Sequence, residues 1–521
     1  MFSFVMSLIF SGVAAALLTL ASIKILQILQ LSGYKPKGIF AWLKRTKFDY
    51  LKRFFCLAFF SFATAFLFIM SFPNYYIRYI GFAFFIALMI FFIVLEKKQK
   101  QKTRLVYTNR IKRLLVIIPI LYAAISFVLI YFAFDIARIE FSLIAISPLL
   151  IPFIPILAHF IIYPIEVLIG KMHFNRAKKK LDNAKHLIRI GISGSYGKTT
   201  TKNILAVLLG EKYRVLSTPK SVNTPMGLSK IINEHDLTKF DVFIAEMGAK
   251  RVGETEELCE FIAPRFGIVT KTGPQHLETF LTLDNAVDTE FSLASRVGEL
   301  VVLNIDDEHV AKRADGIDKD RAVFLGVDAT YENVRIGEDG TQFDFKMGDE
   351  SVEIKVQLLG RHIPEVFCQA ALLASKMGVG FDEIARLAGD IKPVKHRLEL
   401  IKTANGVVLD DAYNSNPEGA KNALEVLGCF EGTKVLISPG FIELGVIESE
   451  ENFKLGQAAA ALVDYLIVVK NEDIFKGAIE GGMSEDRVMV VPSLDAALEA
   501  LKKLGLEKQA VLFLNDLPDN Y

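Results

Sequence analysis

The sequence predicts a multi-helix transmembrane domain followed by an α/β region, with a P-loop ATPase-like central domain and a smaller doubly wound C-terminal domain. Three observations predict this class. Hydrophobic residues make up 52% of the 521 residues, and their excess lies before residue 171. A glycine-rich, phosphate-loop-like segment occupies residues 191–201. From residue 187 onward, short apolar runs alternate with helical patterns. We place the domains at residues 1–175, 176–393 and 394–521.

The first domain contains five long apolar stretches. A bilayer is crossed by about 20 apolar residues in a helix, and all but the third stretch reach that length. The first stretch lacks a short apolar core with a small-residue cleavage site, so we interpret it as a retained anchor. The alternative, buried helices of a soluble protein, fits such a succession poorly. Prolines interrupt the last stretch, which could kink or re-enter without crossing. The predicted crossings are residues 4–23, 54–72, 81–95, 114–134 and 141–158.

Basic residues predict the orientation of these crossings. Lysine and arginine fill residues 35–53 and 97–113, whereas residues 73–80 and 135–140 hold only Arg78 and Arg138. Basic loops stay in the cytoplasm, so the N-terminus faces out and the region after residue 171 faces in. We therefore expect a multi-pass protein of the cytoplasmic membrane with cytoplasmic catalytic domains.

Charge divides the chain into two bodies. Residues 1–185 carry a net charge of +18 and the rest carries −17, although the whole chain has only +1. A basic inner face suits anionic membrane lipids, and an acidic soluble portion argues against nucleic acid as a partner. The four cysteines lack C-x-x-C spacing, so neither a zinc site nor a disulfide framework is indicated.

The segment GISGSYGKTTT is typical of a loop that binds ATP. Glycines let backbone N–H groups point at phosphate oxygens, a lysine adds positive charge, and a threonine hydroxyl can reach Mg²⁺. Ile192 stands where the usual pattern has its first glycine, so an ordinary glycine-rich turn is the alternative. The predicted nucleotide-binding residues here are Gly194, Ser195, Gly197, Lys198, Thr199 and Thr200.

Polar residues also follow the predicted strands at 241–246, 266–270 and 300–304, where parallel sheets present ligands. Glu246 can hold Mg²⁺ opposite Thr199, although a strand-end glutamate is otherwise a solvated side chain. His276, after a Gly-Pro turn, suits metal ligation, but a loop histidine is more often structural. Asn304 can contact adenine through its amide.

A second alternation of strands and helices follows a boundary near Pro393. A polar, hairpin-like region at 334–355 and a helix near 366–377 precede that boundary. Arg397, Asp411 and Asn414 lie in the second domain and can join the site only if this domain folds back over the loop, which places the reaction in a cleft. A polar turn with a helix cap is the alternative for residues 410–417. The expected strands are residues 407–409, 435–437, 465–469, 488–491 and 510–514.

Several motifs stand in order along the chain: GISGSYGKTTTKNIL, SVNTPMGL, AEMGAKRVGE, KTGPQHLETF, LNIDDEH, KHRLE, LDDAYNSNPEGA and PGFIELG. Together they resemble the Mur ligase superfamily across about residues 186–521. The resemblance implies that the central domain binds ATP and two Mg²⁺ ions and that the C-terminal domain closes over it. It implies catalytic roles for Lys198, His276 and Arg397. It also assigns Thr199, Glu246 and His276 to metal, Asn304 to adenine, and Arg397, Asp411 and Asn414 to the nucleotide.

The chain departs from the family pattern at several places. Membrane helices replace the family's uridine-nucleotide-binding domain, and Ile363 and Val366 stand where the family has asparagines. Glu290 aligns with the family's carbamate-bearing lysine. Because a glutamate is already an anionic oxygen ligand, we expect it to approach the second Mg²⁺, the alternative being an ordinary surface acid. The family's Lys-Gly-Ser-Arg-like segment is replaced by residues 515–518.

The expected function is therefore a membrane-anchored, ATP-dependent amide ligase of cell-wall precursor assembly that works through an acyl phosphate. Its partners would be a wall-peptide precursor, lipid-linked or soluble, and an amino acid or dipeptide, with D-alanyl-D-alanine addition to a muramoyl peptide as the first expectation. One alternative is a ligase for another envelope polymer, such as a polyglutamate-type chain. Another is a membrane-bound pseudoenzyme that acts as a scaffold.

Overall fold

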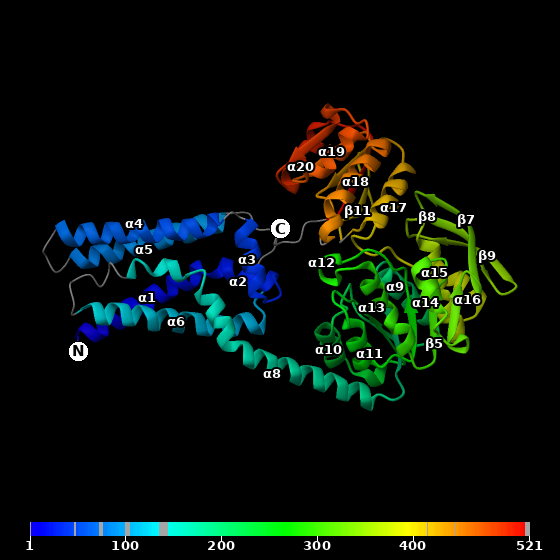
Figure 1. Ribbon diagram of the computed structural model, residues 1–521, viewed down its shortest axis with the longest axis horizontal. Coiled ribbons are helices and arrows are strands. Elements are labelled where there is room, and N and C mark those ends of the chain that lie inside the picture. The colour runs from blue at the N-terminus through cyan, green and yellow to red at the C-terminus, as the bar shows by residue number, and fades with distance from the viewer. Residues whose placement is uncertain are drawn as a thin grey trace. The chain divides into compact units, whose positions relative to one another are not determined.

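The structure is a computed structural model that describes residues 2–45, 48–71, 77–98, 105–134, 144–413, 415–442 and 444–515. The chain forms two compact units (Figure 1). The first, here called the helical unit, extends to Lys171, and the second, the α/β unit, begins at Met172.

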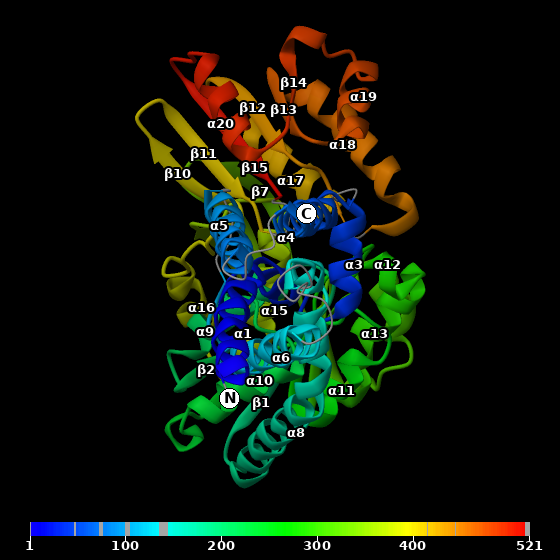
Figure 2. The same cartoon turned by 90° about the vertical axis from the view of Figure 1, so that its left-hand side faces the viewer.

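Long helices build the helical unit. They lie side by side in Figure 1, and Figure 2 views them closer to end on. The first and sixth helices run antiparallel, with the rings of Phe4 and Phe127 5.5 Å apart. The fourth and fifth form a hairpin in which Arg53 Nη1 lies 3.3 Å from Glu96 Oε1. The helices are α1 (Phe2–Ala21), α2 (Ile23–Leu31), α3 (Pro36–Arg45), α4 (Asp49–Ser71), α5 (Ile77–Lys98), α6 (Asn109–Phe134), the 3₁₀ helix η1 (Ser147–Leu150) and α8 (Ile154–Asn183).

Three helices of the described residues are long and apolar enough to cross a membrane, and a shorter apolar helix covers Phe82–Glu96. The three are Phe4–Ala21, Asn109–Tyr131 and Ile154–Asn183. Large apolar side chains such as Phe55, Phe60 and Val116 are more than half exposed on the surface of the unit.

The last predicted crossing, residues 141–158, is wrong as a single helix. Residues 145–153 form turns and the short helix η1, and the long helix of this region begins only at Ile154. Pro148 and Pro152 explain the interruption, because proline lacks the N–H that a helix interior needs. Residues 141–143 lie outside the described part of the chain.

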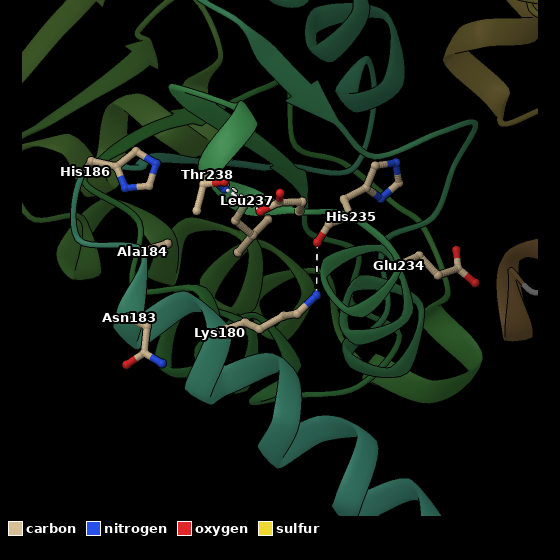
Figure 3. A pocket seen from close by; sticks show the side chains of 9 residues that line it. Lys180, Asn183, Ala184, His186, Glu234, His235, Leu237 and Thr238 are labelled. Atoms are coloured by element: carbon tan, nitrogen blue, oxygen red, sulfur yellow. Dashed lines mark hydrogen bonds between the residues drawn. The ribbon is translucent and has the colours of Figure 1, made fainter.

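The last turns of α8 belong to the α/β unit. Ala177 and Leu181 are buried in its core, and the rings of Phe174 and Phe261 lie 4.3 Å apart. Lys180 Nζ donates to the carbonyl oxygens of Ile232, Asn233 and His235 at 3.2, 2.8 and 3.0 Å. Figure 3 shows this lysine reaching the carboxyl end of the neighbouring helix, where helical carbonyls need partners. The end of α8 is thus a structural part of the α/β unit.

The first sheet of the α/β unit has nine strands in the order β2-β3-β1-β4-β5-β6-β7-β8-β9. Pairing is parallel from β2 to β7, and β8 and β9 add an antiparallel meander where we predict a hairpin. The strands are β1 (Ile188–Ser193), β2 (Val215–Ser217), β3 (Val242–Glu246), β4 (Phe266–Val269), β5 (Leu300–Asn304), β6 (Ala322–Leu325), β7 (Ala329–Gly337), β8 (Gly340–Met347) and β9 (Glu350–Val356).

Helices cover both faces of this sheet, as the near-continuous apolar strands require. One core joins the sheet to α9 and α15, and the other joins it to α11, α13 and the end of α8. The helices are α9 (Lys198–Leu209), α10 (Pro225–Glu234), η2 (Leu237–Lys239), α11 (Glu254–Ile262), α12 (Leu277–Phe280), α13 (Leu283–Arg296), α14 (Glu308–Ala314), η3 (Lys319–Arg321), α15 (Ile363–Lys376) and α16 (Phe381–Ala388).

The second sheet has six strands in the order β10-β11-β15-β12-β13-β14, parallel except for the edge strand β10. All five strands predicted for this domain are present. The elements are β10 (Glu399–Thr403), β11 (Gly406–Asp411), α17 (Pro417–Gly428), β12 (Thr433–Ser438), η4 (Gly445–Ile447), α18 (Glu448–Leu462), β13 (Tyr465–Val469), α19 (Glu472–Glu480), η5 (Glu485–Arg487), β14 (Val488–Val491), α20 (Leu494–Lys503) and β15 (Gln509–Leu514).

Candidate functional site

The phosphate-loop-like segment joins the end of β1 to the start of α9. Gly194 has φ +123°, and a Cβ atom there would lie 2.2 Å from Thr270 Oγ1. Gly197 has φ +82° and caps α9. Only glycine fits these two positions, because other residues are strained at positive φ and the space at Gly194 is closed. The sequence therefore folds into a tight turn that ends at a helix N-terminus, the arrangement that suits phosphate.

Several hydrogen-bond donors of the phosphate-loop-like segment already donate to backbone carbonyl oxygens of the chain. The N–H groups of Ser195 and Tyr196 both donate to the carbonyl oxygen of Lys271 at 3.0 Å. Ser195 Oγ also donates to the Gly273 carbonyl at 3.0 Å. Lys198 Nζ donates to the carbonyl oxygens of Gly194 and Ser195. The first-turn N–H groups of residues 198–200, Thr200 included, have no intrahelical acceptor and are the donors best placed for a phosphate.

Glu246, at the end of β3, is the centre of a buried polar cluster. Its Oε2 accepts from Thr199 Oγ1 at 3.0 Å and from Lys202 Nζ at 2.9 Å. Its Oε1 accepts from Asn223 Nδ2 at 3.2 Å. With 1% exposure, Glu246 is not a solvated strand-end acid. The structure thus brings together Thr199 and Glu246, two of the predicted metal ligands.

The donor set fits a divalent cation. A carboxylate and a hydroxyl oxygen are ligand types that Mg²⁺ takes. The ammonium group of Lys202 forms an ion pair with the Glu246 carboxylate. Burial lowers the pKa of Lys202, while Glu246 acts in the opposite direction and the positive charge of Arg397 adds to the lowering. Sequence reasoning missed Lys202 and Asn223. The available signal for Lys202 was a lysine on the face of α9 that otherwise carries apolar residues.

Glu290 does not join this cluster. It lies on α13, where its Oε2 accepts the N–H of Gly194 at 2.9 Å and its carbonyl oxygen accepts from Ser193 Oγ at 2.7 Å. It is 2% exposed, so the alternative of a surface acid is wrong. Burial raises its pKa to about 7, opposed by the charge of Lys198 and the Gly194 N–H. Glu290 therefore anchors the start of the phosphate loop, and its metal role stays a prediction.

His276 lies in the loop after β4, at the N-terminus of α12. Its φ of +52° is unusual for a residue with a side chain. The residue is partly buried. Its roles in metal binding and catalysis stay predictions.

Asn304 ends β5 in a buried amide–carboxyl pair. Its Nδ2 donates to Glu365 Oε1 at 2.8 Å, and its Oδ1 accepts the Asp306 N–H at 3.0 Å. Burial raises the pKa of Glu365 to about 7, opposed by the charge of Lys271 and the hydrogen bond from Asn304. The amide is thus held in a fixed orientation, which a group that contacts a nucleotide base requires. Glu365 was not predicted from the sequence.

The described residues predicted in the C-terminal domain lie next to its first two strands, since Arg397 precedes β10 and Asp411 ends β11. Arg397 stacks on the Tyr413 ring at 4.6 Å. Asp411 Oδ1 accepts the Leu398 N–H at 3.1 Å, and burial raises the pKa of Asp411 to about 7, against the charge of Arg397. Asn414 lies outside the described residues. His396, beside Arg397, bonds Asp410 at 2.7 Å and forms with Glu399 a group able to hold a metal.

Polar contacts join the C-terminal domain to the neighbourhood of the loop. The Arg361 N–H donates to Asn422 Oδ1 at 2.8 Å, and Asn422 Nδ2 lies 2.9 Å from His362 Nδ1. Lys271, whose carbonyl holds the loop, forms an ion pair with Glu418 on the same helix, α17. The C-terminal domain is therefore held against the segment that shapes the phosphate loop.

A separate cavity of about 550 Å³ lies at the end of α8. Lys180, His186, His235 and Thr238 are among its lining residues, as Figure 3 shows. None of the predicted site residues lines it.

Comparisons with known proteins agree with this arrangement. Residues 192–374 match the Mur ligase middle domain, and residues 396–514 match the Mur ligase glutamate ligase domain. The UDP-N-acetylmuramoyl-tripeptide–D-alanyl-D-alanine ligase of Bacillus subtilis is 26% identical over 332 residues, or 62% of this chain and 72% of the relative. The ligase of the same name from Mycobacterium bovis is 30% identical over 297 residues, or 54% of this chain and 58% of the relative.

A solved structure shows the same fold. The MurF ligase of Thermotoga maritima, in complex with ADP, superposes with a TM-score of 0.59 at 24% identity and covers 67% of this chain and 80% of its own. The helical unit lies outside both matched segments. The chain therefore belongs to the Mur ligase family, a family of ATP-dependent amide ligases that use ATP with Mg²⁺.

Proposed function

We propose that the chain is a membrane-anchored ligase that joins an amino acid or dipeptide to a cell-wall peptide precursor, with D-alanyl-D-alanine and a muramoyl tripeptide as the first substrates to test. The observation that carries this proposal is the Thr199–Glu246–Lys202 cluster beside the phosphate loop. ATP would supply the phosphoryl group that converts the precursor's carboxylate to an acyl phosphate, with ADP as the leaving group, and Mg²⁺ would neutralise charge on that group. The amine then displaces phosphate and forms the amide.

The protein's own residues position this reaction. The first turn of α9 and Lys198 present positive charge to a polyphosphate, and Thr199 and Glu246 offer oxygen ligands to Mg²⁺. Asn304 presents its amide to adenine, and Arg397 and Asp411 bring the C-terminal domain to the nucleotide. His276 is proposed as a further metal ligand. Closure of the domains aligns the amine and keeps water from the activated carboxylate.

The helical unit supports a membrane location. Arg53 and Glu96 pair where α4 begins and α5 ends, so the described residues of the two basic segments next to this pair lie at the same end of the unit. By the positive-inside rule this end faces the cytoplasm and the N-terminus faces out. With membrane helices in place of a nucleotide-sugar domain, we propose that the precursor is presented at the membrane, where tethering raises its effective concentration.

An ADP-release screen tests the function. The detergent-purified full chain is given soluble and lipid-linked muropeptide precursors with D-alanyl-D-alanine, single amino acids or glutamate. Release that requires both an acceptor and an amine supports the ligase, and the pair that works names the substrates. When a polyglutamate acceptor replaces the muropeptide, release only with this acceptor and with glutamate as the amine would favour another envelope polymer.

One observation favours a scaffold without ligase activity. Val366 takes the place of a family asparagine, and its Cγ1 would lie 2.8 Å from a Cβ at Gly197, so an apolar group packs against the loop. Nucleotide binding without ADP release for any pair of substrates would support this second reading.

A further inference from the structure

We propose that Arg110 and Arg113 form a binding site for the phosphate headgroup of an anionic membrane lipid. This inference concerns the helical unit alone and does not depend on the ligase reaction. Both arginines lie in the first turns of α6. They come from the basic end of the unit, near the cytoplasmic surface if the proposed orientation holds.

The two guanidinium groups are fixed in place by their neighbours. Arg113 forms a two-point contact with Glu166 on α8, with Nε to Oε1 at 2.5 Å and Nη2 to Oε2 at 2.9 Å. This bidentate pairing holds the planar group in one orientation. Glu166 is only 9% exposed, whereas Arg113 is 36% exposed and can reach a ligand.

Arg110 lies beside this pair. Its guanidinium carbon is 3.8 Å from the centre of the Tyr34 ring, and its Nη2 is 3.2 Å from His159 Nδ1. Its Nε is 4.0 Å from Glu166 Oε2, which is too long for a hydrogen bond. Within the described residues this buried Nε has no hydrogen-bond partner.

The charges of this cluster do not balance. Among the described residues, these two arginines face one carboxylate, and His159 carries no negative charge in either protonation state. The Nε of Arg110 is buried without a hydrogen-bond partner among the described residues, so this donor and the excess positive charge call for an anion. Arginine matches phosphate oxygens with two parallel N–H groups, which makes phosphate the fitting anion.

The surroundings indicate a lipid rather than a free ion. The rings of Phe160 and Tyr163 lie 5.7 and 5.8 Å from the His159 ring, and both residues are about half exposed. Apolar side chains that are exposed directly beside a charged site fit a ligand with a charged head and an apolar chain. A phosphate headgroup can come from a phospholipid or from a polyprenyl phosphate or diphosphate, and both present the same chemistry to the two arginines.

Binding to the full chain in neutral detergent tests this proposal without ATP. Dioctanoyl phosphatidic acid, dioctanoyl phosphatidylcholine, geranylgeranyl diphosphate and inorganic phosphate are titrated by thermophoresis. We expect phosphatidic acid to bind at least about tenfold more tightly than phosphatidylcholine, since charge-assisted hydrogen bonds are the stronger kind. Equal affinities of phosphatidic acid and geranylgeranyl diphosphate support a general anionic-lipid site, and a tighter diphosphate supports a prenyl-linked ligand.

Variants locate the site. Arg110→Gln should weaken phosphatidic acid binding at least about tenfold. The double variant Arg113→Gln with Glu166→Gln should do the same without leaving a lone buried charge. Arg53→Gln is the matched control, because Arg53 also forms an ion pair between two helices of the unit.

The opposite results overturn the proposal. They are equal binding of phosphatidic acid and phosphatidylcholine, or inorganic phosphate that binds as tightly as the lipids. A lower melting temperature in the two arginine variants with unchanged lipid affinity would show that the cluster only clamps α8 to α6.

Discussion

The two units of this chain differ in where their apolar and charged side chains lie. In the helical unit, large apolar side chains are exposed, and the interhelical ion pairs Arg53–Glu96 and Arg113–Glu166 lie near the basic segments of the sequence. In the α/β unit, apolar residues fill the interior, and buried charged groups such as Glu246 and Lys202 collect around one loop. The rule that large apolar side chains are buried thus describes the α/β unit better than the helical unit. The proposed membrane location would account for this contrast, with lipid around the first unit and water around the second.

The largest expected effect comes from breaking the site of the α/β unit. Lys198→Ala should lower substrate-dependent ADP release by about 100-fold or more, because the ammonium neutralises charge on the transferring phosphoryl group. The melting temperature should change little, since the Lys198 side chain donates to two carbonyl oxygens of the loop and lies outside the apolar core of the described residues. ADP release equal to wild type would remove the ATP-site assignment.

The next effect concerns α8, the helix that the two units share. A chain that starts at Lys185 loses Ala177, Leu181 and the Lys180 contacts to three carbonyls, whereas one that starts at Met172 keeps them. We expect the shorter chain to lose about 3 kcal/mol or more of unfolding free energy relative to the longer one, measured by urea denaturation. Equal stabilities would show that the end of α8 is only a linker.

Variants of Glu290 test whether this buried acid binds metal or only anchors the start of the phosphate loop. Glutamine keeps an oxygen for the Gly194 N–H, so Glu290→Gln tests the charge, and Glu290→Ala tests the anchor. If the metal prediction holds, the glutamine variant needs markedly more Mg²⁺ for ADP release, and wild type keeps full activity without CO₂. If only the anchor matters, the alanine variant alone loses ATP affinity, by about tenfold. Unaltered Mg²⁺ dependence in Glu290→Gln would exclude the metal role.

Arg397 and Asp411 test whether the C-terminal domain completes the site. Either residue changed to alanine should lower kcat/KM for ATP by about tenfold, because each is proposed to act on the closed arrangement. Both variants should remain folded by circular dichroism. Lys434→Ala, on the same sheet but outside the proposed site, is a suitable control. Wild-type kinetics in both variants would show that the cleft is misplaced.

The smallest effect is a pH dependence of the nucleotide-free protein. Burial raises the pKa of Glu290, Glu365 and Asp411 to about 7, above the values of exposed acids. Their protonated forms favour folding, so this contribution is complete at low pH and is lost as the pH rises through about 7. The melting temperature should fall by a few degrees between about pH 5 and pH 8, and less in Glu365→Gln. A flat profile in wild type would contradict these buried environments.

The sequence predicts most of the fold because hydrophobic period and strand ends are local signals. The alternation after residue 187 places β3, β4 and β5 and their terminal residues Glu246 and Asn304 correctly. Contacts made by side chains are not local. Lys202 and Glu365 reach the site because α9 and α15 pack on the sheet. The position of Lys202 on the apolar face of α9 indicates that it is buried, but the sequence does not indicate its partner Glu246. Glu290 turns to Gly194 for the same reason, and the prolines around residue 150 divide an apolar run that has the length of a helix.

One measurement tests most directly whether ligase chemistry is carried on a membrane-embedded unit. Membranes from cells that express the full chain are washed with alkaline carbonate, returned to neutral pH and assayed for ADP release with precursor and amine. We predict that the protein stays in the membrane pellet and that the pellet releases ADP only with both substrates and with Lys198 intact. Release of the protein into the wash, or ADP formation that ignores the Lys198→Ala change, would contradict the account.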